Sequence, residues 1–331
     1  MEGVGVKSSV RNLAIAVVST GALVGGALFA QGAFAASSAD GFASLNGGTT
    51  GGTSGSTVTV TSLSALTTAA KSSTTEVIKV SGNFTCSADV VVASNKTILG
   101  VGSSSGLTGC GLNIKKVSNV VVKNMKIAKV LAANGNGDAI HIETSTNVWI
   151  DHNDLSSDQN NGKDYYDGLV DITHAADYIT VSYNKLHDHY KASLVGHSDS
   201  NASEDTGHLR VTYHHNYWLN INSRMPSLRF GKGHVYNNYF VNGDTGVHSR
   251  ENAQMLVQNN VFVNVSTPIL TTGDSPVDGY VNQSGNDFGT GTNDITRTGS
   301  FTSPGYSYTL TATSSVASTV TSNAGTGKIT S

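Results

Sequence analysis

Two groups of charged residues in this chain have the types and spacing needed for chemistry on an acidic ligand. The cationic group consists of Arg224 and Arg229, which flank a proline in "RMPSLR", and of Lys191. The acidic group consists of Asp138, Asp167 and Asp171. Carboxylate oxygens are ligands that calcium prefers, and guanidinium groups bind carboxylates strongly. Together the two groups predict a calcium site beside a receptor for a ligand that carries carboxylates.

A recurring strand pattern must bring these distant residues together. Short alternating apolar stretches such as "NVWIDHNDL" and "YITVSYNKL" each close on an asparagine. The six asparagines, at spacings of 29, 31, 32, 22 and 22, are Asn124, Asn153, Asn184, Asn216, Asn238 and Asn260. Such self-similarity is typical of a solenoid. We therefore predict an all-β fold, a right-handed parallel β-helix of three parallel sheets, over most of residues 55 to 290, with these asparagines stacked in a ladder. Asparagine that merely ends strands is the alternative, but it does not easily produce six in register.

Counting back from each ladder asparagine places the charged residues around the coil. Asp138 lies 15 residues before its asparagine, Asp171 lies 13 before and Arg224 lies 14 before. Lys191 falls near the same place once the extra residues of its longer coil are removed. Because coils are about 4.8 Å apart, Asp171 and Arg224 are expected roughly 10 Å apart, two coils along. The extra residues must leave the solenoid as the loops "SSDQNNGKDYY" and "HSDSNASEDTGH", which we expect to wall a cleft.

The ends of the chain carry their own signals. In residues 1–35, Lys7 and Arg11 precede an apolar run that ends in small residues before Ala36, which is the pattern of a secretory signal peptide. A membrane anchor is the alternative, but the run is short for a bilayer span and is broken by polar residues. We therefore predict a secreted, extracellular protein whose residues 36–331 form a single domain, with the C-terminal tail packed on the solenoid. The net charge of −3 argues against a nucleic acid partner, and no membrane contact is expected after signal cleavage.

Cys86 and Cys110 are the only two cysteines. In an exported protein such a pair most simply forms a disulfide, which would stabilise the fold by roughly 3 kcal/mol. A zinc site is the alternative, but no histidine is suitably spaced near them.

Histidine and tryptophan offer further candidates for the site. His152, His214 and His215 could act as general bases, but they flank ladder asparagines, which favours a packing role in the turns. Trp149 and Trp218 likewise favour packing over a sugar platform.

Several of these motifs resemble those of the pectate lyases of polysaccharide lyase family 1, which are extracellular β-helix enzymes. The most specific are "WIDH" and the R-x-P-x-x-R arrangement in "RMPSLR", and the similarity runs from "DGFASLNGGTTGG" to the closing "YSYTL". The resemblance implies calcium-dependent β-elimination of polygalacturonate, which is de-esterified pectin, to 4,5-unsaturated oligogalacturonides.

The resemblance also implies a role for each matching residue. Asp138, Asp167 and Asp171 match the calcium ligands, and Arg224 matches the catalytic base. Lys191 and Arg229 match contacts to substrate carboxylates that assist catalysis, and Arg250 in "VHSREN" matches a further substrate arginine. Asn136 departs from the family, because some members carry another acidic ligand there. From the sequence alone, Arg224 would be only an electrostatic stabiliser.

Two other functions stay open at this point. A pectin lyase acting on methyl-esterified pectin would need neither calcium nor a carboxylate at Asp171. A non-catalytic carbohydrate-binding β-helix protein would not need the set formed by Lys191, Arg224 and Arg229. A monomer is expected.

Overall fold

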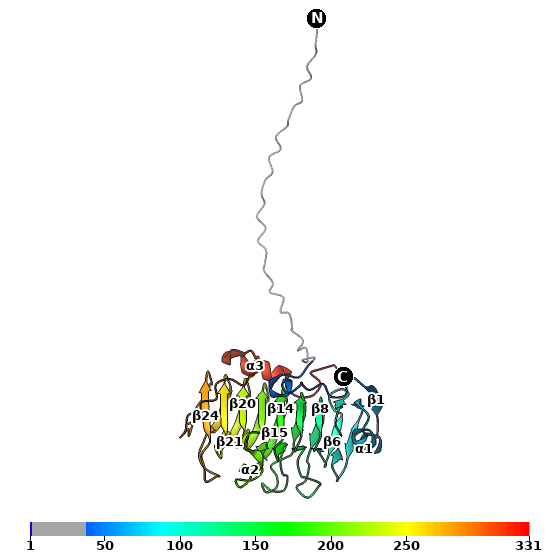
Figure 1. Cartoon of the computed structure of the whole chain (residues 1–331), viewed down its shortest axis with the longest axis horizontal. Coiled ribbons are helices and arrows are strands. Elements are labelled where there is room, and N and C mark those ends of the chain that lie inside the picture. Colours follow the sequence, from blue (N-terminus) through cyan, green and yellow to red (C-terminus); the bar gives the residue numbers. More distant parts are fainter. Residues whose placement is uncertain (2–37, 331) are drawn as a thin grey trace. The chain divides into compact units, whose positions relative to one another are not determined.

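The computed structural model describes residues 38–330, together with Met1, so the predicted signal peptide and its cleavage site lie outside the described residues. The chain winds as a right-handed parallel β-helix, and Figure 1 shows its coils side by side from β1 at one end to β24 at the other. This confirms the fold class predicted from the asparagine spacing. Among the described residues, no helix is long and apolar enough to span a bilayer.

Each full coil contributes one strand to each of three parallel faces, which we call the first, second and third sheets. The first sheet contains β1 (Ser56–Val60), β2 (Glu76–Val80), β5 (Lys96–Gly100), β8 (Ser118–Lys123), β11 (Thr146–Asp151), β14 (Asp177–Ser182), β17 (Arg210–His214), β20 (Lys232–Tyr236), β22 (Gln254–Gln258) and β24 (Tyr280–Ser284). The second sheet contains β3 (Asn83–Thr85), β6 (Gly106–Thr108), β9 (Lys126–Ala128), β12 (Asp154–Ser156), β15 (Lys185–Lys191) and β18 (Tyr217–Ser223). The third sheet contains β4 (Val90–Val91), β7 (Leu112–Lys115), β10 (Ile140–Glu143), β13 (Val170–Thr173), β16 (Leu194–Val195) and β19 (Ser227–Arg229).

Two long strands join the second and third sheets near the C-terminal end. β21 (Tyr239–Arg250) pairs with β18 through its first residues and with β19 through its last. β23 (Val261–Leu270) pairs with β21 along both parts. The second and third sheets are therefore continuous at this end, which the sequence pattern did not predict.

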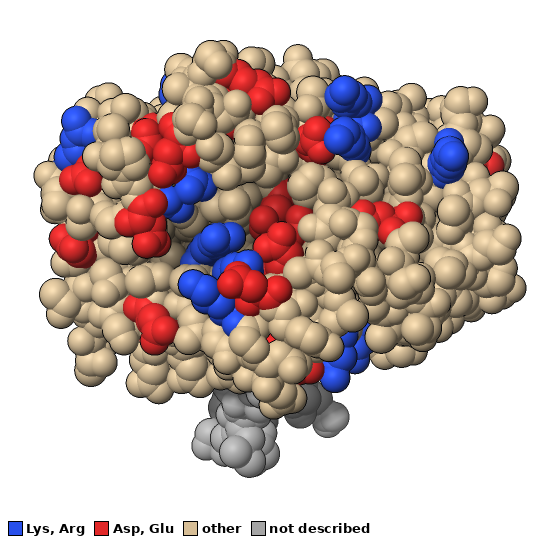
Figure 2. Space-filling model, turned by 90° about the horizontal axis from the view of Figure 1, so that it is seen from below, with Lys and Arg blue, Asp and Glu red and all other residues tan. Residues whose placement is uncertain are grey.

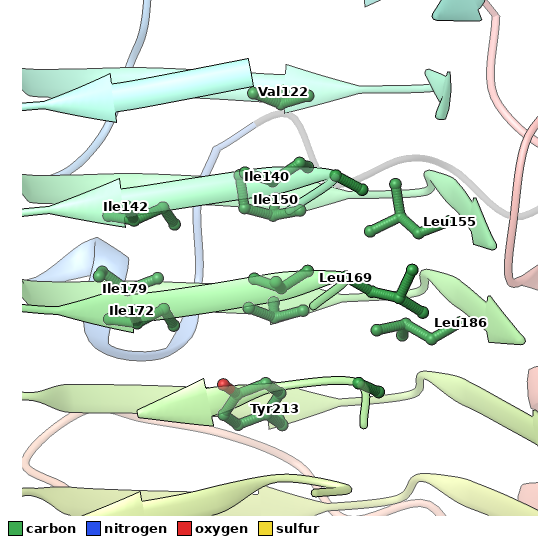
Figure 3. Close-up of a cluster of buried hydrophobic side chains, with 14 of the residues drawn as sticks. Val122, Ile140, Ile142, Ile150, Leu155, Leu169, Ile172, Ile179, Leu186 and Tyr213 are labelled. Carbon is green, nitrogen blue, oxygen red and sulfur yellow. The ribbon is translucent and has the colours of Figure 1, made fainter. Parts of the chain in front are cut away.

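Stacked apolar side chains fill the centre of the solenoid. Because successive coils pair in register, Ile142 lies on Ile172 and Leu155 lies on Leu186 (Figure 3). All four of these side chains are fully buried. Burial of apolar surface of this kind is the main favourable contribution to folding. Tyr213 also points into the core.

A ladder of buried asparagines runs along the turn between the first and second sheets. The Asn184 amide donates to Asn216 Oδ1 at 3.0 Å, and the Asn216 amide donates to Asn238 Oδ1 at 3.0 Å. Each oxygen also accepts the backbone N–H of the asparagine on the preceding coil, as Asn216 Oδ1 does from Asn184 at 3.0 Å. The ladder therefore satisfies backbone groups that would otherwise be buried without partners.

The ladder differs from the prediction at both ends. Asn124 is not in it, because Met125 holds the ladder position and donates its N–H to Asn153 Oδ1 at 2.9 Å. Asn124 occupies the preceding residue, where φ is +55°. Asparagine tolerates that left-handed conformation better than most residues do. At the other end Asn286, which was not predicted, extends the ladder by accepting from the Asn260 amide at 2.9 Å.

Helices and terminal segments cover the solenoid. The helix α1 (Leu63–Lys71) begins at Ser62, whose hydroxyl accepts the Ala65 N–H, and buries Leu66 and Ala70 at the N-terminal end of the core. A disulfide joins Cys86 to Cys110, as predicted. The short helix α2 (Ala202–Asp205) and the helix α3 (Thr313–Asn323) lie on opposite flanks (Figure 1).

Both terminal segments run across many coils. The segment that contains the 3-10 helix η1 (Gly41–Ser44) crosses the first sheet: Phe42 N–H donates to Thr212 Oγ1, and Gly52 N–H donates to Thr97 Oγ1. The C-terminal tail returns along the ladder flank, where α3 packs Val316 and Val320 on Val261. Beyond α3, the Gly327 N–H donates to Asn124 Oδ1.

Replacement of a ladder asparagine should destabilise the protein far more than replacement of the half-buried Asn222 on the same coil. Asn216→Ala removes the acceptor of two Asn184 N–H groups and the donor to Val181 O, all buried. We expect a loss of about 3 kcal/mol, since each unsatisfied buried group costs on the order of 1–3 kcal/mol. Asn222→Ala removes hydrogen bonds to Asp244 and Gln159 that water can replace, and should cost under about 1 kcal/mol. Urea unfolding of both variants measures the difference, and equal midpoints would contradict a structural role for the ladder.

Candidate active site

A cleft of about 630 Å³ lies along the third sheet, where the chain turns into it from the second sheet. Figure 2, which views the face that carries α2, shows Lys and Arg side chains gathered beside Asp and Glu side chains in a hollow. The charged residues that line the cleft are Lys163, Asp164, Lys191, Arg224, Arg229, Asp244, Arg250 and Asp274. The structure therefore brings together the four cationic residues that the sequence predicted.

Two of the three predicted acidic ligands converge on one glycine. Asp138 precedes β10, and Asp171 lies in β13 on the next coil. A Cβ atom on Gly168 would lie 2.7 Å from Asp138 Oδ1 and 2.5 Å from Asp171 Oδ1, so only glycine leaves room for both oxygens. Backbone N–H groups of Gly168 and Leu194 donate to these same two oxygens, at 2.8 and 3.0 Å. The pair is thus held in place by the backbone.

Burial, with repulsion from neighbouring carboxylates, raises the pKa of both of these side chains. Burial raises the pKa of Asp171 well above its ordinary value, and the nearby charge of Asp138 adds to this effect. Burial also raises the pKa of Asp138, although its hydrogen bond with His141 at 2.7 Å opposes the shift. A bound cation would relieve this repulsion, because opposite charge favours the ionised form of a carboxylate.

The third predicted ligand, Asp167, faces a cation in the cleft. Asp167 Oδ1 lies 3.1 Å from Lys191 Nζ. Among the described residues, no group of three or more His, Cys, Asp or Glu side chains is arranged closely enough to hold a metal ion. Asp138, Asp167 and Asp171 are nevertheless close enough to influence one another electrostatically.

Lys191, at the end of β15, lies between two carboxylates. Its Nζ contacts Asp164 Oδ1 at 2.8 Å as well as Asp167. Burial alone would lower the pKa of Lys191, but its hydrogen bonds to Asp164 and Asp167 outweigh burial and raise it. Lys191 is therefore a permanent cation at neutral pH.

Arg224 occupies the corner that follows β18. Ser223 pairs in register with Lys191, so Arg224 lies next to Lys191 on the following coil. The backbone of Arg224 has a φ of +59°, and its carbonyl accepts the Ser193 N–H at 2.9 Å. No side chain among residues 38–330 forms a hydrogen bond or ion pair with its guanidinium, which lines the cleft. Arg224 is therefore available to a ligand.

Arg229 and Arg250 lie side by side on adjacent coils, because β19 and β21 pair in register. Asp199, from the loop "HSDSNASEDTGH", contacts both: it accepts from Arg229 Nε and lies 3.6 Å from Arg250 Nη2. Burial, followed by the charge of Arg229, lowers the pKa of Arg250 to about 10, so Arg250 stays charged at neutral pH. The sequence identified this loop but not the role of Asp199.

Asn136, which departs from the pattern of the resembling family, contacts another carboxylate, that of Asp89. Its backbone N–H and its side-chain amide both donate to Asp89 Oδ2, at 3.0 and 2.9 Å. Asn136 thus anchors the loop that leads to Asp138. Sequence reasoning missed Asp89, and it also missed His141, the hydrogen-bond partner of Asp138.

The three histidines next to ladder asparagines and the two tryptophans have the packing roles that the sequence favoured. His152 and His215 stack on the two sides of Tyr183, and His214 is buried against Tyr236. Trp218 is buried in the solenoid core, whereas Trp149 is buried against Ala39 and Ala43 of the N-terminal segment. Two histidines near the cleft, His189 and His248, are different, because burial and nearby cations lower the pKa of each to about 4. They are neutral at physiological pH and add no charge to the cleft.

Comparison with known proteins gives one consistent answer. The family model described as pectate lyase matches residues 11–329. Probable pectate lyase A of Neosartorya fischeri is 53% identical over 286 residues, which cover 86% of this chain and 87% of that protein. Probable pectate lyase B of Aspergillus flavus is 61% identical over 197 residues, but the match spans only 60% of each chain.

Solved structures agree with the sequence comparisons. The pectate lyase from Bacillus sp. N165, determined in complex with trigalacturonate, superposes with a TM-score of 0.80 at 35% identity, covering 87% of this chain and 99% of that one. Pectate lyase II from Xanthomonas campestris superposes with a TM-score of 0.70 at 27% identity, covering 87% of this chain and 98% of that one. With a family model that matches nearly the whole sequence and relatives above 50% identity, the chain belongs to the pectate lyase family of enzymes.

Proposed function

We propose that this protein is a secreted pectate lyase that cleaves polygalacturonate by calcium-dependent β-elimination and releases 4,5-unsaturated oligogalacturonides. The observation that carries the proposal is the cleft itself, in which four cations stand beside a buried pair of carboxylates. A uronate polymer presents one carboxylate per sugar, so a row of fixed cations matches its charge. The trigalacturonate complex of the structural relative from Bacillus sp. N165 supports this substrate class.

Different residues of the cleft are assigned to charge neutralisation and to proton abstraction. Removal of the C5 proton next to the uronate carboxyl develops negative charge on that carboxyl, so fixed cations must lie where the charge develops. Lys191, Arg229 and Arg250 are assigned to binding and neutralising carboxylates of the substrate. Arg224 is assigned the role of base, because its guanidinium has no partner among the described residues.

The bonding changes of the reaction balance without an added oxidant or reductant. Arg224 accepts the C5 proton, and the electron pair of the C5–H bond forms the C4–C5 double bond. The C4–O bond to the next sugar breaks, and the leaving oxygen takes a proton from water. Arginine is normally protonated, so the base role requires the concentrated positive charge of the cleft to favour the neutral form.

The carboxylates fit a calcium ion. The donors are hard oxygens, as calcium requires, and the absence of a Cβ at Gly168 leaves the space between Asp138 Oδ1 and Asp171 Oδ1 open. We assign Asp138 and Asp171 as its ligands, with Asp167 as a third that would have to turn toward them from Lys191, which it contacts at 3.1 Å. When bound, calcium would contact the substrate carboxylate and make the C5 proton more acidic.

The two alternative functions account for less of the structure. A pectin lyase acts on neutral esters and gives no reason to bury two carboxylates in contact with Gly168. A non-catalytic binding protein gives no reason to leave the guanidinium of Arg224 without a partner. We expect the protein to act as a monomer, as one domain from residue 36 to 331.

Removal of calcium should abolish the activity. With polygalacturonate as substrate, absorbance of the unsaturated uronide should rise in calcium, stop in excess chelator and recover when calcium is restored. Calcium should also raise the melting temperature of the wild type and much less that of Asp171→Ala, because binding stabilises only the folded state. Full turnover of highly methylated pectin in excess chelator would instead indicate a pectin lyase.

Arg224→Lys should fold normally and bind oligogalacturonate, yet lose nearly all turnover. Lysine keeps the charge but loses the reach and fixed geometry of the guanidinium. Displacement of the proton-accepting atom by about an ångström can cost on the order of a hundredfold in kcat. Binding should change little, because Lys191, Arg229 and Arg250 are retained.

The control for this variant is Arg297→Lys, since Arg297 contacts Tyr280 and Asp278 outside the residues that line the cleft. Both variants are compared by kcat and by calorimetric binding of trigalacturonate. An Arg224→Lys protein that keeps more than about a tenth of the wild-type kcat would move the base role to another residue, with Lys191 the next candidate.

A further inference from the structure

Asp164 places a carboxylate of the protein on one of the cations assigned to the substrate. Its Oδ1 lies 2.8 Å from Lys191 Nζ. The Asp164 side chain is 72% exposed, whereas that of Lys191 is 15% exposed, so the lysine is fixed and the aspartate reaches it from solvent. A substrate carboxylate that binds Lys191 must compete with Asp164 for the same ammonium group.

Asp164 has fewer side-chain partners than Asp199, the other loop carboxylate that contacts cations of the cleft. Asp199 accepts from Arg229 and from Ser275 Oγ, and it also lies near Arg250. Asp164 has Lys191 as its one side-chain hydrogen-bond partner among the described residues. Asp199 is therefore held in place by several contacts, whereas a substrate carboxylate can displace Asp164 from Lys191.

The loop that carries Asp164 is fixed at its base and free at its tip. At the base, the Gln159 amide donates to His189 O and Asn222 Oδ1, and the hydroxyl of the buried Tyr166 donates to Asp158 Oδ2. Residues 159–165 are all exposed. Asp164 can therefore turn away from Lys191 without breaking a buried contact.

We propose that Asp164 is a resident competitor for the substrate carboxylate, which holds Lys191 until a uronate displaces it and so sets the affinity of the cleft for its polymer. The inference rests on the proposed function, because it takes Lys191 as a substrate contact. Exchange of one carboxylate for another keeps the number of carboxylates on Lys191 constant, so the lysine loses no ion pair without replacement as substrate enters. This exchange lowers the affinity for substrate, because the new ion pair between the substrate carboxylate and Lys191 replaces the existing ion pair between Asp164 and Lys191.

Asp164→Asn should lower KM for polygalacturonate about two- to fivefold, which is the range for loss of an exposed ion pair, and leave kcat nearly unchanged. Asp164→Glu, which keeps a carboxylate on the loop, should have a KM closer to that of the wild type. Calorimetric titration with trigalacturonate in an Arg224→Lys background, where turnover is lost, should show the same gain in affinity for Asp164→Asn.

The matched control is Asp244→Asn. Asp244 also lines the cleft, but its carboxylate accepts from the neutral amide of Asn222, so this change removes the same unit of charge without releasing a cation. A KM for Asp164→Asn equal to that of Asp244→Asn would overturn the inference and reduce the effect to net charge. An unchanged or higher KM, or a loss confined to kcat, would overturn it as well. A wild-type protein that releases no unsaturated product from polygalacturonate would instead defeat the proposed function.

Discussion

The buried asparagine ladder is the constraint on which the rest of this structure depends. Each amide bonds the coil before it and the coil after it, so a slip of one residue in any coil would leave several buried polar groups without partners. Register in the ladder fixes register in the first sheet and, through the short second-sheet strands, in the third. For this reason Asp138 and Asp171, from different coils, meet at Gly168, and Lys191 lies next to Arg224.

The same stacking places like charges next to one another, and neighbouring groups of opposite charge or polarity reduce the resulting electrostatic repulsion. Arg229 and Arg250 are adjacent because their strands pair in register, and Asp199 reaches both from a loop. On the acidic side, backbone N–H groups stabilise the two buried oxygens, yet burial still raises the pKa of Asp171. The fold therefore keeps a cationic group and an acidic group in fixed positions in the cleft. Such a preorganised electrostatic field is what catalysis requires.

Periodicity in the sequence was sufficient to predict the solenoid and the grouping of Lys191, Arg224 and Arg229, because both follow from counting residues around a coil, whereas Arg250 was expected only from the family resemblance. Periodicity did not predict every ladder residue correctly, because asparagine occurs both in the ladder and at the preceding position of positive φ. In Asn237-Asn238 and Asn259-Asn260 the first residue takes a positive φ and the second joins the ladder. A lone asparagine, such as Asn124, cannot be assigned to one role by spacing. Asp164 and Asp199 lie in loops outside the repeat, so no periodic signal places them opposite Lys191 and Arg229.

The two terminal segments that cross the coils change how the solenoid unfolds. A stack in which each coil contacts only its neighbours behaves as a one-dimensional array, and it can fray from an end one repeat at a time. Here η1 and the residues after it bond strands from β17 to β5, and the tail beyond α3 bonds Tyr183 and Asn124. Fraying at an end must therefore break contacts made in the middle of the stack, which makes the linear array cooperative. The protein should then respond to heat or denaturant as one unit, in the manner of a globular domain.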